Sequence, residues 1–159
     1  MTSVRCDLGV ATVVTKNSSL LLVKEASGKY SNHWGLPKGL VNENELPRDA
    51  ALRELKEECD VTGKVTGIHA IREYLSDIGP AVFIAYSVEL DLGQVPKPSN
   101  EIAKAEFIDF ADFDNLLWVS EAMKSISVNA LSHTPFSTVD FTKQRGHPYL
   151  LHLPSGVIQ

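Results

Sequence analysis

The chain has 159 residues, of which 43% are hydrophobic and 22% charged, so it suits one globular domain and excludes extended disorder. Its net charge of −5 argues against binding nucleic acid or an anionic membrane through bulk charge, so any phosphate ligand must be bound locally. Two cysteines, no signal-peptide pattern and no apolar run near the ~20 residues of a membrane span predict a cytoplasmic protein.

The first part of the chain predicts strands that lead into a glycine- and proline-rich segment. Two β-prone runs, residues 10–14 and 20–23, flank turn-forming residues at 17–19, which predicts a β-hairpin. Residues 26–32 are small and polar and predict a loop. Residues 34–41 carry Gly or Pro at alternate positions, which is typical of a bent, extended backbone that approaches a ligand.

The clearest predicted helix covers residues 47–59. Pro47 suits its first position, and the segment is rich in good helix formers. Asp60 can adopt the left-handed conformation that often ends a helix. Further strands are expected over residues 64–74, 80–90 and 102–110, followed by one or two short helices over 112–131.

The predicted elements fix the fold class and the division of the chain. Strands outnumber helices and their order is mixed, which indicates an α+β protein or an α/β/α sandwich. Residues 1–131 hold the clear elements and form one domain, whereas residues 132–159 are a tail without a clear period. The tail is too apolar to stay exposed to solvent, so we expect it to pack on the same domain or on a second subunit. Monomer and homodimer both remain open.

Three glutamates gather on one side of the predicted helix. Glu54, Glu57 and Glu58 stand at i, i+3 and i+4, so they fall within an arc of about 100°. Like charges on adjacent turns repel each other, while oxygen ligands at this density suit Mg²⁺ or Mn²⁺ shared with substrate phosphates. The pattern predicts a divalent metal site, with an ordinary solvated helix face as the alternative.

The surrounding residues extend this pattern. From Gly39 to Val61 the sequence reads GLVNENELPRDAALRELKEECDV. It resembles the Nudix box, G-x5-E-x7-R-E-U-x-E-E-x-G-U with U a bulky aliphatic residue, at eight of nine specified positions. Asp60 stands where the pattern has Gly. A Trp-Gly-x-Pro-x-Gly lead-in at residues 34–39 and a Glu-Ile pair at Glu101 continue the likeness.

This resemblance implies a fold, a reaction and a set of roles. The Nudix fold is an α/β/α sandwich with a mixed sheet, and its loop–helix–loop binds Mg²⁺ or Mn²⁺ to hydrolyse a nucleoside diphosphate linked to another moiety. The implied metal ligands are the carbonyl of Gly39 and the carboxylates of Glu54, Glu57, Glu58 and Glu101, with Glu106 as the alternative to Glu101. The implied catalytic residues are Glu54, Glu57 and Arg53. Glu54 is a metal ligand or the general base, and Glu45 orients Arg53.

Three residues are the predicted substrate-binding groups. The Pro-Lys-Gly segment resembles Nudix members that act on phosphate-rich substrates, so Lys38 could pair with an extra phosphate, and a solvent-facing lysine is the alternative. Tyr30 and Trp34 could stack on a base, although Trp34 also suits packing before the box. Additional candidates for the pocket are the aromatic residues Tyr74 and Phe83 and the cations Lys24, Lys29 and Arg72.

The expected function is Mg²⁺-dependent pyrophosphohydrolysis of a nucleoside or dinucleoside polyphosphate. One alternative is a Nudix hydrolase of ADP-ribose, nucleotide sugars or oxidised nucleoside triphosphates. A second is a non-catalytic nucleotide-binding regulator, which the four retained box glutamates disfavour. An RNA-decapping enzyme is disfavoured by the net charge, and an isoprenoid diphosphate isomerase by the context of Cys6 and Cys59. The expected partner is a small nucleoside diphosphate derivative, with no membrane and no nucleic acid.

Overall fold

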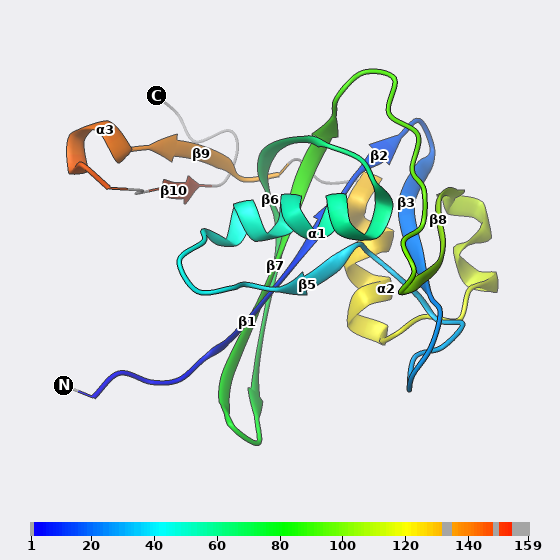
Figure 1. The fold of residues 1–159 in the computed structure, drawn as a ribbon, viewed down its shortest axis with the longest axis horizontal. Helices are drawn as coiled ribbons and strands as arrows, with labels where there is room; N and C mark the ends of the chain where they lie inside the picture. The colour runs from blue at the N-terminus through cyan, green and yellow to red at the C-terminus, as the bar shows by residue number, and fades with distance from the viewer. Residues whose placement is uncertain (1, 132–134, 148–149, 154–159) are drawn as a thin grey trace.

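The computed structural model describes residues 2–131, 135–147 and 150–153. Its strands form two main sheets (Figure 1). The first sheet has the order β5–β1–β7–β6, and only its β1–β7 pair is parallel, so the sheet is mixed. Its strands are β5 (Lys38–Leu40), β1 (Asp7–Val13), β7 (Gly79–Leu90) and β6 (Gly63–Ser76). In the second sheet β3 (Ser19–Glu25) pairs with β2 (Thr15–Lys16), β4 (Trp34–Gly35) and β8 (Ile102–Asp109).

Helices cover the strands on both sides. On one side α1 (Pro47–Cys59) buries Leu55 and Cys59 against Leu21 and Val23 of β3. On the other side α2 (Glu121–Val128) buries Met123 in a cluster with Leu20 and Leu22. A 3₁₀ turn at Phe110–Asn115 precedes α2, and another at Asn129–Leu131 follows it. Because alternate residues of β3 face opposite layers, the fold is an α/β/α sandwich, as predicted.

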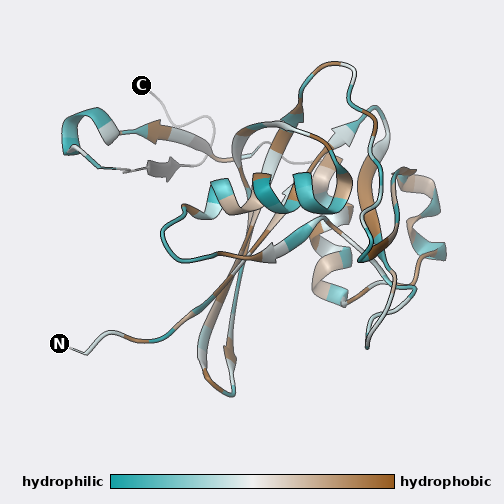
Figure 2. Cartoon of the chain, in the orientation of Figure 1, coloured by the Kyte–Doolittle hydropathy of each residue, from teal (hydrophilic) through white to brown (hydrophobic). Residues whose placement is uncertain are grey.

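The predicted limits of α1 are confirmed. Pro47 occupies the first turn, and Leu46 before it makes no side-chain cap. Asp60 has φ 53° and ψ 34°, and its N–H donates to the carbonyl of Lys56 at 3.0 Å. The Asp60 carboxylate also pairs with the Lys56 ammonium at 2.5 Å. Asp60 therefore ends the helix in the left-handed conformation that glycine usually adopts. Figure 2 shows the alternation of hydrophilic and hydrophobic positions along α1 that one buried side requires.

The predicted N-terminal hairpin is confirmed only near its turn. The strand β2 pairs with the start of β3, and Asn17 between them has φ 54°. The strand β1 instead pairs with β7 and β5 in the other sheet, so its assignment to that hairpin is wrong. The end of β1 is buried on both faces, from Val10 to Val13, which a central strand between two layers requires and a surface hairpin does not.

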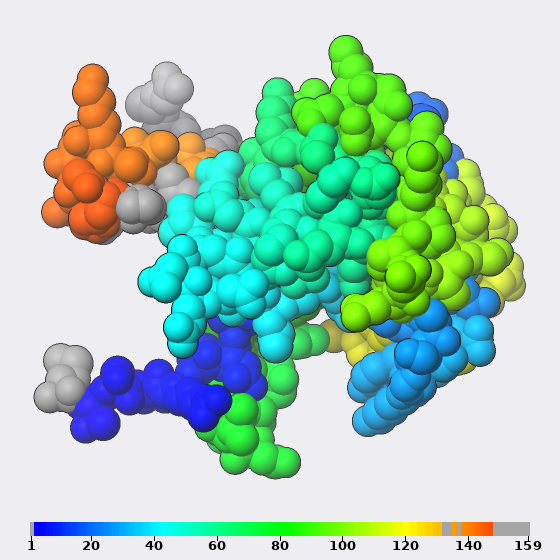
Figure 3. All heavy atoms as spheres, viewed as in Figure 1, coloured from blue at the N-terminus to red at the C-terminus, as the bar shows by residue number. Residues whose placement is uncertain are grey.

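The described part of the tail begins against β6. The N–H of Phe136 donates to the carbonyl of Ile68 at 2.8 Å, and a Cβ built on Gly67 would lie 2.1 Å from the Phe136 carbonyl oxygen. Beyond it β9 (Ser137–Asp140), α3 (Thr142–Arg145) and β10 (Leu150–Leu153) follow. Figure 3 shows β9 and α3, in orange, as a lobe beside the segment that leads into α1. Within the predicted tail, residues 132–134, 148–149 and 154–159 lie outside the described residues. Packing on a second subunit stays a prediction.

Across the described residues, no helix combines the length and the apolar character needed to cross a bilayer.

Candidate active site

Arg53 forms the centre of an ion-pair network at α1. Its Nε and Nη2 donate to the two carboxylate oxygens of Glu45, at 3.2 and 2.8 Å. Its Nη1 donates to Glu54 at 2.7 Å and to Glu57 at 3.1 Å, while Nη2 also donates to the carbonyl of Leu40 at 2.9 Å. The bonds to Glu45 are the main cause that raises the pKa of Arg53, and in turn they lower the pKa of Glu45. Arg53 therefore ties the loop after β5 to the helix.

Gly39 lies directly against the Glu54 carboxylate. A Cβ built on Gly39 would stand 2.0 Å from Cδ of Glu54, so any side chain here would displace the Glu54 carboxylate. Gly39 is paired with Val10 of β1, which fixes its backbone in the sheet. The missing side chain therefore lets the main chain of β5 approach a carboxylate of α1.

Glu58 faces the strand β5 from the helix. One of its carboxylate oxygens accepts the backbone N–H of Lys38 at 2.9 Å. Burial raises the pKa of Glu58 to about 7, although the bond from Lys38 opposes the shift. The Lys38 ammonium pairs with Glu25 at 2.5 Å, so the charge of this predicted phosphate-binding lysine is already offset.

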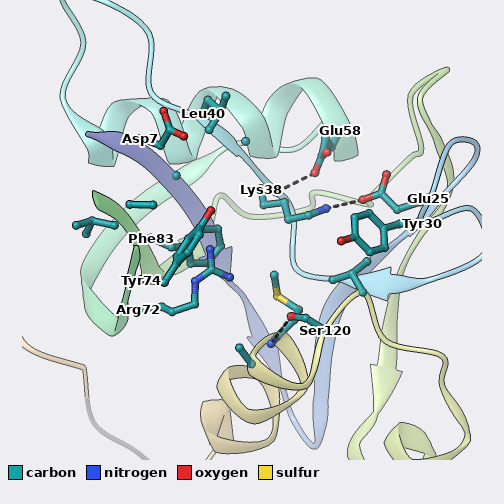
Figure 4. A pocket seen from close by; sticks show the side chains of 17 residues that line it. Asp7, Glu25, Tyr30, Lys38, Leu40, Glu58, Arg72, Tyr74, Phe83 and Ser120 are labelled. Atoms are coloured by element: carbon teal, nitrogen blue, oxygen red, sulfur yellow. Dashed lines mark hydrogen bonds and ion pairs between the residues drawn. The ribbon is translucent and has the colours of Figure 1, made fainter. Parts of the chain in front are cut away.

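A cavity of about 760 Å³ opens beside these groups (Figure 4). This volume lies within the range of small-molecule sites. Gly39, Lys38 and Glu58 line it at the α1 side, with Glu25 and Tyr30 next to them. The opposite wall comes from the β6–β7 hairpin and from the start of α2, and its lining includes Arg72, Tyr74, Phe83, Ser120 and Met123.

The structure brings most of the predicted site residues together. Gly39, Lys38, Glu58 and Tyr30 line the cavity, and Glu45, Arg53, Glu54 and Glu57 form the network beside it. The prediction that Trp34 offers a ring for stacking is wrong, because the side chain is only 7% exposed and packs in the core with Leu36 and Met123.

Neither Glu101 nor Glu106 lines the cavity. The loop before Glu101 does reach α1, because the N–H of Ser99 donates to the carbonyl of Glu58 at 3.2 Å. Glu101 itself is exposed, and its carbonyl accepts the N–H of Ala26 at 3.3 Å. Glu106 is also exposed on β8, with Lys104 at 3.9 Å. A metal-binding role for Glu101 stays a prediction.

The α1 side fits a hard divalent cation in its chemistry. The carboxylates of Glu54, Glu57 and Glu58 and the carbonyl of Gly39 are all oxygen donors, which Mg²⁺ and Mn²⁺ prefer. Within the described residues no three acidic, His or Cys side chains converge as metal ligands: Arg53 holds Glu54 and Glu57, and Lys38 holds Glu58. Binding a cation would therefore require these carboxylates to exchange a hydrogen-bond donor for the ion.

Sequence reasoning missed two features of the cavity. Glu25 ends β3 with no motif around it, and its pairing with Lys38 depends on the fold. The sequence suggests Arg72 only as one of several cations near the pocket. Its contacts with the rings of Tyr74 and Phe83 depend on the register between β6 and β7. The alternation of β6 gives Arg72 and Tyr74 a common face, which is the one signal in the sequence that could have grouped them.

The family model of the NUDIX domain matches residues 7–128. The chain belongs to the NUDIX family. Its similar relatives include the m7GpppN-mRNA hydrolase dcap-2 of Caenorhabditis elegans, 33% identical over 65% of this chain, and Nudix hydrolase 6 of Arabidopsis thaliana, 28% identical over 72%. A solved NUDIX hydrolase of Nitrosomonas europaea matches with a TM-score of 0.70 and 19% identity, over 89% of this chain and 74% of that one. The NUDIX chain described here spans only 13% and 42% of the two relatives.

Proposed function

We propose that this NUDIX chain hydrolyses a phosphoric anhydride bond in a nucleoside or dinucleoside polyphosphate, with Mg²⁺ or Mn²⁺ as cofactor. The observation that carries the proposal is the meeting of Glu58 and Gly39 at the wall of a ligand-sized cavity. Glu54 and Glu57, held by Arg53, lie beside that wall. Such an arrangement offers several oxygen ligands next to a space for an anionic substrate.

The chain's own groups have distinct tasks in this reaction. A cation held by Glu54, Glu57, Glu58 and the Gly39 carbonyl would offset the charge of the diphosphate and acidify water. A carboxylate oxygen of Glu54 or Glu57 accepts the proton of the attacking water. Arg53 keeps both carboxylates in place, and the two-oxygen contact with Glu45 fixes the plane of its guanidinium. The network therefore supplies positioned bases as well as ligands.

Two observations support a phosphate-rich substrate. Lys38 lines the cavity next to the carboxylates, and a phosphate could take the place of Glu25 as its partner. The relative dcap-2 is named a hydrolase of m7GpppN-mRNA, a substrate whose name itself contains a chain of phosphates.

Tyr30, with 44% exposure on the cavity wall, offers a ring to a base. Free cysteines at positions 6 and 59 suit a cytoplasmic location.

A substrate panel tests this function. The purified chain is incubated with dinucleoside polyphosphates, nucleoside triphosphates, ADP-ribose, nucleotide sugars and a capped RNA, with Mg²⁺, with Mn²⁺ and with a chelator. We expect turnover of the polyphosphates, which the chelator abolishes. Preference for ADP-ribose would contradict the substrate class, and cleavage of the capped RNA alone would move it to decapping. No turnover of any compound would favour a nucleotide-binding regulator.

A further inference from the structure

The two cations that line the cavity differ in their partners. The Lys38 ammonium lies 2.5 Å from Glu25. Arg72, on β6, forms no ion pair within the part of the chain that the structure describes, and its buried Nε has no hydrogen-bond partner there. A buried donor that gives up water without gaining an acceptor is unfavourable. The protein therefore keeps a charged, unpaired donor on the wall of its cavity.

Aromatic rings hold Arg72 in this position. Its guanidinium carbon lies 5.0 Å from the ring centroid of Tyr74 and 4.8 Å from that of Phe83. Arg72 and Phe83 are register partners across β6 and β7, and Tyr74 shares the face of Arg72 because it is two residues further along β6. Such ring contacts stabilise the cation without occupying its N–H groups. The donors at the edge of the guanidinium thus remain available to a ligand.

The neighbouring strand leaves room for this arrangement. A Cβ built on Gly9 of β1 would lie 2.8 Å from Cδ2 of Phe83. The ring is 6% exposed, so it is enclosed between the backbone of β1 and Arg72. Because Gly9 has no side chain, the Phe83 ring can lie against β1 and still contact the guanidinium of Arg72. Gly9 and Phe83 are therefore positioning residues for Arg72.

We propose that Arg72 binds a phosphate group of the substrate that lies beyond the diphosphate being cleaved. Figure 4 shows Arg72, Tyr74 and Phe83 grouped away from Glu58, Glu25 and Tyr30, across the cavity. A substrate that reaches from the α1 carboxylates to Arg72 presents oxygens at both ends, and a guanidinium can bind two phosphate oxygens at once. The inference rests on the proposed function and narrows it to substrates with more than two phosphates.

Equilibrium binding separates this role from catalysis. Two methylene-bridged analogues that resist cleavage, one of diadenosine tetraphosphate and one of diadenosine diphosphate, are titrated calorimetrically into the wild type and into Arg72→Met. We expect the variant to bind the tetraphosphate analogue about tenfold more weakly, since the charged contact between the guanidinium and a phosphate is lost, and the diphosphate analogue with little change. Lys64→Met, which removes an exposed cation from the same strand, is the matched control and should bind both analogues normally.

Each result decides the assignment. Equal weakening for both analogues would overturn it, because Arg72 would then support the shared base or the shape of the cavity. The same titrations are repeated with the corresponding guanosine analogues. If the loss of affinity in Arg72→Met depends on the base and not on the number of phosphates, Arg72 contacts the base, and the assignment is overturned. If Arg72→Met does not fold, Arg72→Lys serves instead, and it should bind the tetraphosphate analogue with intermediate affinity because lysine keeps the charge without the two-pronged geometry. Since no turnover is measured, an inactive protein leaves this test valid.

Discussion

The two walls of the cavity are built in different ways. On the α1 side the charges are paired with each other: Arg53 bonds three glutamates, and Lys38 bonds Glu25. On the β6–β7 side Arg72 contacts aromatic rings and leaves its Nε without a partner among the described residues. The carboxylates of the first wall can replace their present hydrogen-bond donors by a cation. The guanidinium of the second wall can bind an anion without first breaking an ion pair. Substitutions in the first wall should therefore change hydrolysis and Mn²⁺ affinity, whereas those in the second wall should change polyphosphate affinity.

Gly39→Ala should have an effect as large as any substitution in the α1 wall. Its Cβ would collide with the Glu54 carboxylate at 2.0 Å, so either β5 or the carboxylate must move. We expect hydrolysis to fall about 100-fold or more, since ~1 Å of misplacement can cost 10²-fold. The control Gly93→Ala has open space around its Cβ, and its cost is the positive φ of +74°, which Gly39 does not have. Normal activity of Gly39→Ala, measured by nucleotide release, would contradict the close approach at this position.

Arg53→Gln should reduce activity less, by about 10- to 100-fold, because the carboxylates remain while their positioning is lost. Arg53→Lys should not restore it, since an ammonium cannot bond Glu45, Glu54 and Glu57 with a planar fork. The measurement is kcat and Mn²⁺ affinity for each variant. A kcat unchanged in Arg53→Gln would show that the network has no part in positioning the glutamates.

Phe83→Leu should act only on the second wall. The substitution removes one ring that supports Arg72 but keeps its charge, so polyphosphate affinity should fall only about threefold, the size of a modest cation–π contact. Mn²⁺ affinity should not change, because Phe83 lies across the cavity from Glu58 (Figure 4). If Mn²⁺ affinity falls together with polyphosphate affinity, the two walls are not independent.

Asp60→Gly should have the smallest effect and the opposite sign. Asp60 occupies the left-handed region at φ 53°, where glycine avoids the steric cost of Cβ. The gain is partly offset by the loss of the exposed pair with Lys56. We expect thermal unfolding to shift upward by a few degrees at most, with activity unchanged. A clear loss of stability would show that the Asp60–Lys56 pair outweighs the backbone strain.

The same contrast explains how much the sequence could predict. Apart from Glu25, the α1 wall depends on contacts within about one helix and the loop before it. The resemblance of Gly39, Glu45 and Arg53 to the Nudix box was therefore sufficient to anticipate it. The helix limits and the left-handed Asp60 followed from local propensities. The second wall depends on register between β6 and β7, and no local pattern specifies which ring lies opposite Arg72.

Burial and strand pairing account for the errors. Trp34 precedes the box, as a base-stacking residue could, but β4 places it in the core beneath α2. The strand β1 has the composition of a hairpin strand, yet it pairs in parallel with β7, about 70 residues later in the chain. Both outcomes depend on how the layers assemble, which the order of residues in one segment does not determine.

The most direct test of the proposed function is hydrolysis by Glu57→Gln. This substitution keeps the size of an exposed side chain and removes one carboxylate from α1. The control Glu89→Gln also replaces an exposed carboxylate by an amide, but at a pair with Lys64 outside the site. With Mg²⁺ and a dinucleoside polyphosphate, we predict that Glu57→Gln loses about 100-fold or more of the wild-type rate and that Glu89→Gln keeps it. A Glu57→Gln rate near that of the wild type would contradict the assignment of this helix as the catalytic centre.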